Sequence, residues 1–300
     1  MMVGTAKPIH VKIHGLDIGD DFPVRIMGVL NVSQESFYKR SVVDAKDILV
    51  KAKAMIAGGA TMLDVGGRST APNVQPISVD EERARVVTAL KALLPGLDND
   101  RVIISIDTQF ESVAASAMDI FRSSGMENQF VINDVSGLNG DPDLARWVAR
   151  TGKPCIIMAS HGKPGDSLGV EQTIADLGRS ISKLRALGYN VEEKVIVDPA
   201  IGRWIPDKGP IYDLELLHEL ERFRAVGAPL LVAISRKSFI GEVLGEKNPD
   251  NRLYGTLSAT AIAVFKGAHV VRTHDISKET LDTIKVAEAI RRKAITKSLP

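Results

Sequence analysis

Eight short apolar runs recur along the chain, and a segment with helical periodicity follows each of them. Parallel strands need a crossover connection, usually a helix, so this alternation predicts a parallel sheet. Eight strand–helix units in a row predict a (β/α)8 TIM barrel. An open doubly wound sheet has similar content. The count of eight and the lack of a G-x-G-x-x-G motif after the first run favour the barrel.

The expected strands span residues 25–32, 62–65, 102–106, 130–132, 155–158, 194–197, 229–234 and 269–272. The expected helices span residues 44–57, 78–93, 110 onward, 144–150, 171–186, 212–225, 251–265 and 277–294. A short N-terminal hairpin over residues 10–18, with His14 and Gly15 at its turn, is expected to cap the bottom of the barrel. Since no linker or low-complexity tract interrupts the chain, residues 1–300 are predicted to form a single domain.

The composition is that of an ordinary globular protein. A net charge of +1 gives no electrostatic reason to expect nucleic acid or a membrane surface as a partner. No apolar run is long enough to cross a bilayer, and the N-terminal residues lack the apolar core of a signal peptide. The one cysteine, Cys155, fits a reducing compartment. We therefore expect a cytoplasmic protein that binds neither nucleic acid nor membrane.

Polar side chains end almost every apolar run, which is costly for a buried strand unless the ends open onto a shared polar site. A TIM barrel brings all its strand C-termini to one face. Asp107, Asn133 and Asp198 lie at three of these ends. Two carboxylates and an amide match the adjacent N–H and NH2 groups of a pterin or guanine edge. Each aspartate alone could instead be the N-cap of the next helix, but the three together favour a ligand site.

Positive groups follow the seventh and eighth expected strands. Ser235 precedes Arg236 and Lys237, and Arg272 lies two residues before His274. Barrels commonly bind anions near these two strands. We therefore predict an anion site here rather than a set of solvated surface cations.

The first strand ends at Asn31, beside the eighth strand of a closed barrel. Its amide oxygen is a candidate ligand for Mg2+, which proteins usually share with substrate phosphates and water. Two connections, residues 33–42 and 68–76, could close over a reacting centre and exclude water. Plain surface loops would have the same composition.

Eight motifs carry more specific information: IMGVLNVSQESF (26–37), LDVGGRSTAP (63–72), SIDT (105–108), INDVSG (132–137), IIMASHGKP (156–164), DPAIG (198–202), SRKSFIGEVLG (235–245) and VRTHDI (271–276). In this order they resemble the dihydropteroate synthase family and the wider pterin-binding barrel superfamily. They cover essentially the whole barrel, and SRKSFIG, NDVSG and the GG-x-ST-x-P pattern are specific in combination.

The resemblance implies a transferase. Such an enzyme joins 6-hydroxymethyl-7,8-dihydropterin pyrophosphate to an aryl amine and releases pyrophosphate, in folate or methanopterin biosynthesis. It further implies pterin-binding roles for Asp107, Asn133, Asp198 and Lys237, with Met158 among the substrate-binding residues. Homodimers are usual for the family, so a homodimer is expected here.

The resemblance also assigns the other groups. Asn31, Arg272 and His274 would hold the pyrophosphate, with Mg2+ beside Asn31. Ser235 and Lys237 would border the aryl amine. Thr70, in the second of the two connections (residues 68–76), would be a further substrate-binding residue. The implied catalytic residues are Asn31, Asp107, Lys237, Arg272 and His274.

The loops depart from the family pattern. The first has Lys39 and Arg40 where the family has an acid and a glycine, and the second has Arg68 at the usual glutamate position and Ala71 at the usual arginine. A further cation, Arg203, follows the sixth strand. These cations predict a second substrate more anionic than p-aminobenzoate, such as a phosphorylated ribofuranosyl-aminobenzene. Solvent-facing charges on variable loops are the alternative.

Two other functions use the same residues. A methyltransferase acting on a methyl-tetrahydropterin would keep the pterin site and have no pyrophosphate to bind. The retained SRKSFIG motif and the pair Arg272 and His274 argue against it, whereas Ala71 favours it weakly. A non-catalytic pterin-binding protein would show no turnover.

Overall fold

The computed structural model describes residues 8–33, 42–70, 74–97 and 102–293. Within them, eight parallel strands form one sheet in the order β8-β7-β6-β5-β4-β3-β10-β9. The strands are β3 (Arg25–Asn31), β4 (Met62–Gly66), β5 (Ile103–Asp107), β6 (Phe130–Asp134), β7 (Cys155–Met158), β8 (Val195–Asp198), β9 (Leu231–Ala233) and β10 (Val270–Thr273). A parallel bridge between Val197 and Leu230 joins β8 to β9. The sheet therefore closes on itself, which confirms the (β/α)8 barrel and rules out the open sheet.

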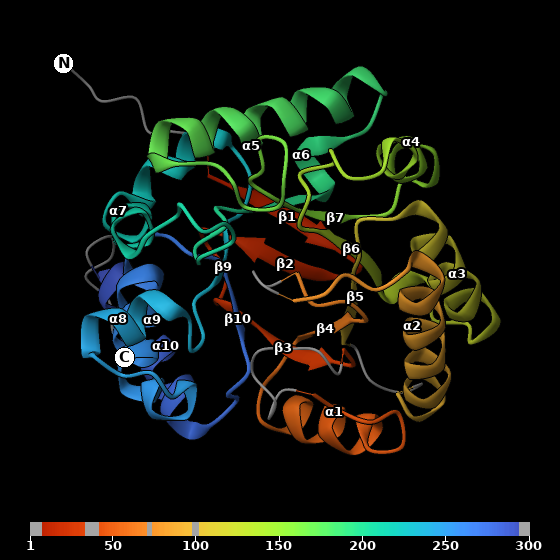
Figure 1. Cartoon of the computed structure of the whole chain (residues 1–300), viewed down its shortest axis with the longest axis horizontal. Helices are drawn as coiled ribbons and strands as arrows, with labels where there is room; N and C mark the ends of the chain where they lie inside the picture. The colour runs from red at the N-terminus through yellow and green to blue at the C-terminus, as the bar shows by residue number, and fades with distance from the viewer. Residues whose placement is uncertain (1–7, 34–41, 71–73, 98–101, 294–300) are drawn as a thin grey trace.

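Helices surround the barrel on all sides (Figure 1). The longer ones are α1 (Ile48–Ala57), α2 (Val79–Leu93), α3 (Glu111–Ser123), α4 (Pro142–Thr151), α5 (Gly169–Ala186), α7 (Pro210–His218), α9 (Leu253–Phe265) and α10 (Lys278–Lys293). The shorter ones are α6 (Val191–Lys194), α8 (Ser238–Leu244) and the 3-10 turns η2 (Leu94–Gly96), η3 (Glu127–Gln129), η4 (Leu220–Val226) and η5 (Pro249–Arg252). Among the described residues, none of these helices combines the length and apolar content that a membrane span requires.

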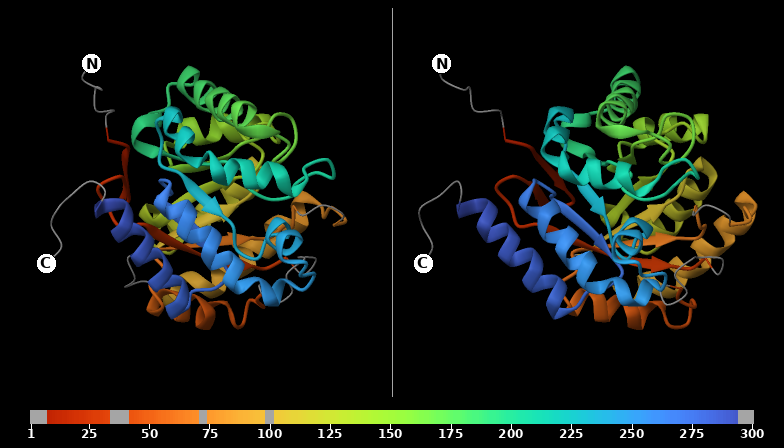
Figure 2. Two further views of the ribbon diagram at one scale, coloured as in Figure 1. Left: turned by 90° about the vertical axis from the view of Figure 1, so that its left-hand side faces the viewer. Right: turned by 60° about the vertical axis from the view of Figure 1, so that its left-hand side comes forward.

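The N-terminal hairpin closes one end of the barrel. Its strands β1 (His10–Ile13) and β2 (Leu16–Gly19) pair antiparallel around the turn at His14 and Gly15. The buried side chains of Ile13 and Ile18 pack against inward-facing residues of the barrel strands. Figure 2 shows the hairpin, in red, at the end of the barrel opposite the strand arrowheads. This confirms the hairpin and leaves the strand C-termini as the open end.

Three helices differ from their sequence predictions. The first begins at Ile48 rather than at residue 44, after a short turn. The segment predicted as one helix over 212–225 is α7 followed by η4, in which Leu220 and Phe223 are buried. Their three-residue spacing suits the three residues per turn of a 3-10 helix. The expected helix 251–265 is η5 followed by α9, and the short α8 that precedes them was not predicted.

Candidate active site

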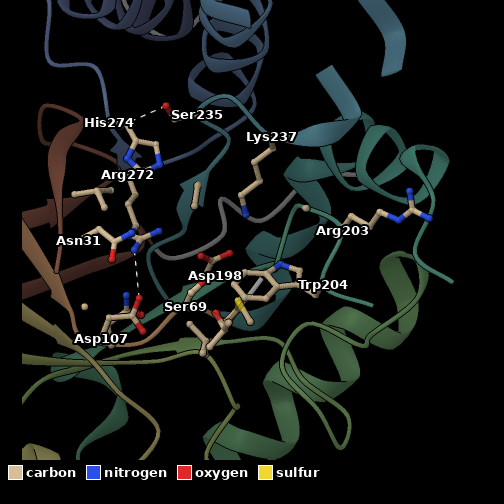
Figure 3. A pocket seen from close by; sticks show the side chains of 18 of the residues that line it. Asn31, Ser69, Asp107, Asp198, Arg203, Trp204, Ser235, Lys237, Arg272 and His274 are labelled. Carbon is tan, nitrogen blue, oxygen red and sulfur yellow. Dashed lines mark hydrogen bonds and ion pairs between the residues drawn. The ribbon is translucent and has the colours of Figure 1, made fainter. Parts of the chain in front are cut away.

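A pocket of about 350 Å³ opens at the C-terminal end of the barrel strands (Figure 3). Most of the residues singled out in the sequence line it: Asn31, Arg68, Thr70, Asp107, Asn133, Met158, Asp198, Arg203, Ser235, Lys237, Arg272 and His274. Two others, Lys39 and Arg40, lie outside the described residues. The closed barrel therefore brings together side chains that are up to 243 residues apart in sequence (274 minus 31).

The two aspartates end strands β5 and β8 and share the pocket with Asn133 of β6. Burial raises the pKa of Asp107 well above its usual range, and repulsion from Asp64 raises it further. Burial likewise raises the pKa of Asp198, although Lys237 opposes the shift. Desolvated acids of this kind gain most from a ligand that donates hydrogen bonds to them.

Neither aspartate is a helix cap. Phe110 occupies the N-cap of α3, and Gly209 occupies that of α7. Asp198 Oδ1 accepts a hydrogen bond from Ala200 N at 2.8 Å, so the local turn uses one oxygen of its carboxylate. The N-cap interpretation of these two residues is therefore wrong.

A third carboxylate, Asp64 of β4, contacts two side chains that line the pocket, Asn133 and Arg272. It is fully buried, and the side-chain nitrogen of Asn133 lies 3.3 Å from each of its oxygens. Arg272 Nε donates to Asp64 Oδ2 at 2.7 Å, and Arg272 Nη2 donates to Asp107 Oδ2 at 3.3 Å. Sequence reasoning gave Asp64 no role. The available signal was its position inside an apolar strand, between Leu63 and Val65.

Lys237 and His274 both line the pocket, and burial lowers the pKa of each. Burial lowers the pKa of Lys237 to about 8, and its ammonium donates to the backbone oxygen of Ile201 and lies 5.0 Å from the centroid of the Trp204 ring. Burial, with repulsion from Arg272, lowers the pKa of His274 to about 3. The imidazole is therefore neutral at pH 7 in the ligand-free protein.

The cations around the pocket are mostly balanced by other groups. Arg68 Nε lies 2.5 Å from Glu82 Oε2 in a buried ion pair. Arg236 points away from the pocket, with its guanidinium 2.7 and 2.9 Å from the two Asp275 oxygens. Arg203 is half exposed, and its Nη2 donates to Pro206 O at 3.1 Å. Because Arg68 is paired with Glu82, it gives no support to a strongly anionic second substrate.

Comparisons with known proteins show the family of this chain. The sequence profile described as pterin binding enzyme matches residues 27–274. The dihydropteroate synthase of Bacillus subtilis is 34% identical over 294 residues, which cover 97% of this chain and 96% of the relative. The chain belongs to the dihydropteroate synthase family.

Solved structures of the dihydropteroate synthase family have the same fold. One from Coxiella burnetii, in complex with pteroic acid, superimposes with a TM-score of 0.77 at 29% identity and covers 94% of this chain and 98% of its own. One from Xanthomonas albilineans, with 4-aminobenzoic acid, gives 0.77 at 27% identity and covers 97% and 100%. The likeness therefore extends over nearly the whole chain.

Few side chains of the described residues could coordinate the Mg2+ that was expected beside Asn31. Asn31 Oδ1 accepts hydrogen bonds from Ser33 N at 3.0 Å and from Ser33 Oγ at 2.5 Å, which use both of its lone pairs. The described residues contain no cluster of three or more His, Cys, Asp or Glu that could hold an ion. The side chains as placed do not fit a protein-held Mg2+. The family's second-loop arginine position, Ala71, lies outside the described residues.

Proposed function

We propose that this chain is a dihydropteroate synthase. It joins 6-hydroxymethyl-7,8-dihydropterin pyrophosphate to an aryl amine, forms a C–N bond and releases pyrophosphate in folate biosynthesis. The observation that carries the proposal is the convergence of Asp107, Asn133 and Asp198 from three strands on one pocket. Family membership and the pteroic acid bound by a relative support it.

The pterin is held by hydrogen bonds to the buried acids. Its adjacent N–H and NH2 groups donate to the two oxygens of the Asp198 carboxylate, and its other polar edge meets Asn133 and Asp107. Because these carboxylates are desolvated, each bond is stronger than the same bond in water. Lys237 packs beside Asp198 and covers the ring from the side of β9.

The bond between the methylene carbon and oxygen breaks, and pyrophosphate departs with the electron pair. The aryl amine nitrogen forms the new C–N bond to that carbon and gives up one proton to the solvent. Charge builds on the leaving oxygens, so positive groups nearby lower the barrier. Lys237 and Arg272 supply that charge, Asn31 donates from its amide nitrogen, and Ser235 borders the amine. His274 is neutral when the substrate binds and donates a hydrogen bond to the pyrophosphate from its ring N–H. A magnesium ion carried by the pyrophosphate stays a prediction, and no step is derived through it.

The second substrate that the site supports best is p-aminobenzoate. The relative from Xanthomonas albilineans was solved with this amine. A phosphorylated ribofuranosyl-aminobenzene needs free cations. Arg68 is paired with Glu82, which leaves Arg203 as the described candidate on the pocket wall. Lys39 and Arg40 stay predictions for that ligand.

The direct test is turnover by the purified chain. The assay mixes the pterin pyrophosphate with p-aminobenzoate and Mg2+ and follows pyrophosphate release and pteroate formation. We expect one pyrophosphate per pteroate. Binding of the pterin without any release would favour the non-catalytic protein. A methyltransferase would neither release pyrophosphate nor bind it in a calorimetric titration. If the enzyme preferred a phosphorylated aryl amine when both amines compete, that amine and not p-aminobenzoate would be the second substrate.

A homodimer is proposed as well. Large apolar side chains are exposed on the neighbouring helices α9 and α10: Tyr254, Ile262, Phe265, Val286 and Ile290. Apolar surface of this kind commonly marks a contact between proteins. Light scattering should give twice the mass of one chain, and Phe265→Lys should give a monomer. A monomeric wild-type protein would contradict it. A single domain and a cytoplasmic location stay predictions.

A further inference from the structure

Residues 67–70 follow β4 and form the rim segment of the pocket. A buried ion pair joins this segment to α2. Arg68 Nε donates to Glu82 Oε2 at 2.5 Å, and only 13% of the Arg68 side chain and 1% of the Glu82 side chain are exposed. The Arg68 guanidinium carbon also lies 5.2 Å from the centroid of the Phe110 ring. A buried carboxylate is costly unless it is paired and hydrogen-bonded. Arg68 therefore has a structural role at the edge of the pocket, because it neutralises the buried Glu82.

The second oxygen of Glu82 reaches the next strand. Thr108 Oγ1 donates to Glu82 Oε1 at 2.6 Å, and Thr108 directly follows Asp107 at the end of β5. The backbone N–H of Thr108 donates to the backbone oxygen of Asn133 at 3.0 Å. One carboxylate thus connects the rim segment to the strand ends that carry two of the predicted pterin-binding residues.

The rim segment is also pressed closely onto α2. A Cβ atom at Gly67 would lie 2.9 Å from Val86 Cγ2, so this position has no room for a side chain. Arg85 Nη1 donates to the backbone oxygen of Gly67 at 3.2 Å. Just two residues further along the chain, Ser69 and Thr70 line the pocket. The position of these two residues therefore depends on how α2 holds the start of the segment.

We propose that Arg68 is a positioning residue. Through Glu82 it fixes the Ser69–Thr70 segment relative to Asp107 and thereby sets the affinity for the aryl amine. The inference rests on the proposed function for the identity of that ligand. Pterin binding depends less on the ion pair, because Asp107 is also held by Arg272.

The test uses paired substitutions. Arg68→Ala leaves a buried carboxylate without its partner, so the double variant Arg68→Ala/Glu82→Ala removes both charges and keeps the test separate from misfolding. In the double variant we expect the KM for p-aminobenzoate to rise about tenfold or more, since small misplacements of substrate-positioning groups are costly. The Kd of the pterin should stay near the wild-type value. Arg68→Lys keeps the charge, so its KM for p-aminobenzoate should lie between those of the wild-type protein and the double variant.

The matched control is Arg83→Ala on the same helix. Arg83 pairs with Asp80 at 2.7 Å, but 45% and 84% of these two side chains are exposed. A surface pair of this kind contributes little, so its loss should leave both constants unchanged. A KM increase in this control equal to that of the double variant would overturn the proposal. So would a double variant in which the pterin Kd rises in parallel with KM.

A second readout needs no turnover. Hydrogen–deuterium exchange of the amides of residues 66–70 in the ligand-free protein should be faster in the double variant and unchanged in Arg83→Ala. If the wild-type protein releases no pyrophosphate, the proposed function fails, while exchange still tests the positioning role. Wild-type exchange rates in the double variant would overturn that role.

Discussion

Arg272, which lines the pocket, forms an ion pair with Asp64, with 2.7 Å between Nε and Oδ2. Asp64 is fully buried, and the other branch of the same guanidinium lies 3.3 Å from Asp107. One arginine therefore balances two acids in a place where unpaired charge would be costly. The predicted contact between Arg272 and the pyrophosphate therefore has to form while the guanidinium is paired with these two acids (Figure 3).

Asp64→Asn should destabilise the fold, because Arg272 and Asn133 would both face a neutral amide. Breaking a buried pair by removing one partner costs about 3–5 kcal/mol of unfolding free energy. Urea unfolding measures it. Asp119→Asn is the control, since 75% of the Asp119 side chain is exposed and its oxygen lies 3.6 Å from Arg122. Equal stability of the two variants would show that the Arg272–Asp64 pair contributes little.

His274 should stay neutral through the physiological range. Burial, together with the charges of Arg272, Lys51, Arg236 and Lys237, lowers its pKa to about 3. An NMR titration should therefore find no protonation of this imidazole between pH 7 and about pH 4. Added pyrophosphate, which opposes those positive charges, should raise the pKa of the imidazole. A pKa near the ordinary value in the free protein would contradict the burial argument.

The same shift makes stability depend on pH. An unfolded histidine has a pKa of about 6.5, so between that pH and about 3 the unfolded chain binds a proton that the folded His274 does not. The contribution of the neutral His274 to the free energy of unfolding is complete above about pH 6.5. Below that pH it is lost by about 1.4 kcal/mol per pH unit. His274→Gln should remove that part of the slope. An unchanged slope in urea unfolding series would refute the linkage.

Gly202→Ala should disturb Lys237. A Cβ atom at position 202, where φ is +131°, would lie 2.7 Å from Nζ and Cδ of Lys237. The lysine has to move, and the pocket loses a positive group, so kcat/KM should fall with little change in secondary structure. Gly209→Ala in the same loop is the control, because nothing lies within 4 Å of its Cβ. Equal kinetics of both variants would contradict the packing argument.

The sequence predicts the barrel well because each strand is a run of apolar residues and most strand ends are polar. That pattern places Asp107, Asn133 and Asp198 at one mouth before any contact is known. It does not reveal the Arg272–Asp64 pair, whose members are 208 residues apart. Nor does it reveal that His274 is neutral, since the burial that lowers its pKa exists only in the folded chain.

Loop charges are the least predictable part of the site. Arg68 looks like an added cation for a substrate, yet its partner Glu82 lies 14 residues away on α2. Whether a loop arginine faces a ligand or a buried acid depends on how the loop packs. Local sequence does not contain that information.

The central claim is that Asp198, with Asp107 and Asn133, binds the pterin. Calorimetric titration of 6-hydroxymethylpterin into wild-type protein and Asp198→Asn tests it most directly. The asparagine still accepts from Ala200 N but presents a mixed edge to the ligand. We predict a loss of about 1.5–3 kcal/mol, or about 10- to 150-fold in Kd. Asp207→Asn, an exposed acid of the same loop, should bind like wild type. Wild-type affinity in Asp198→Asn would contradict the account.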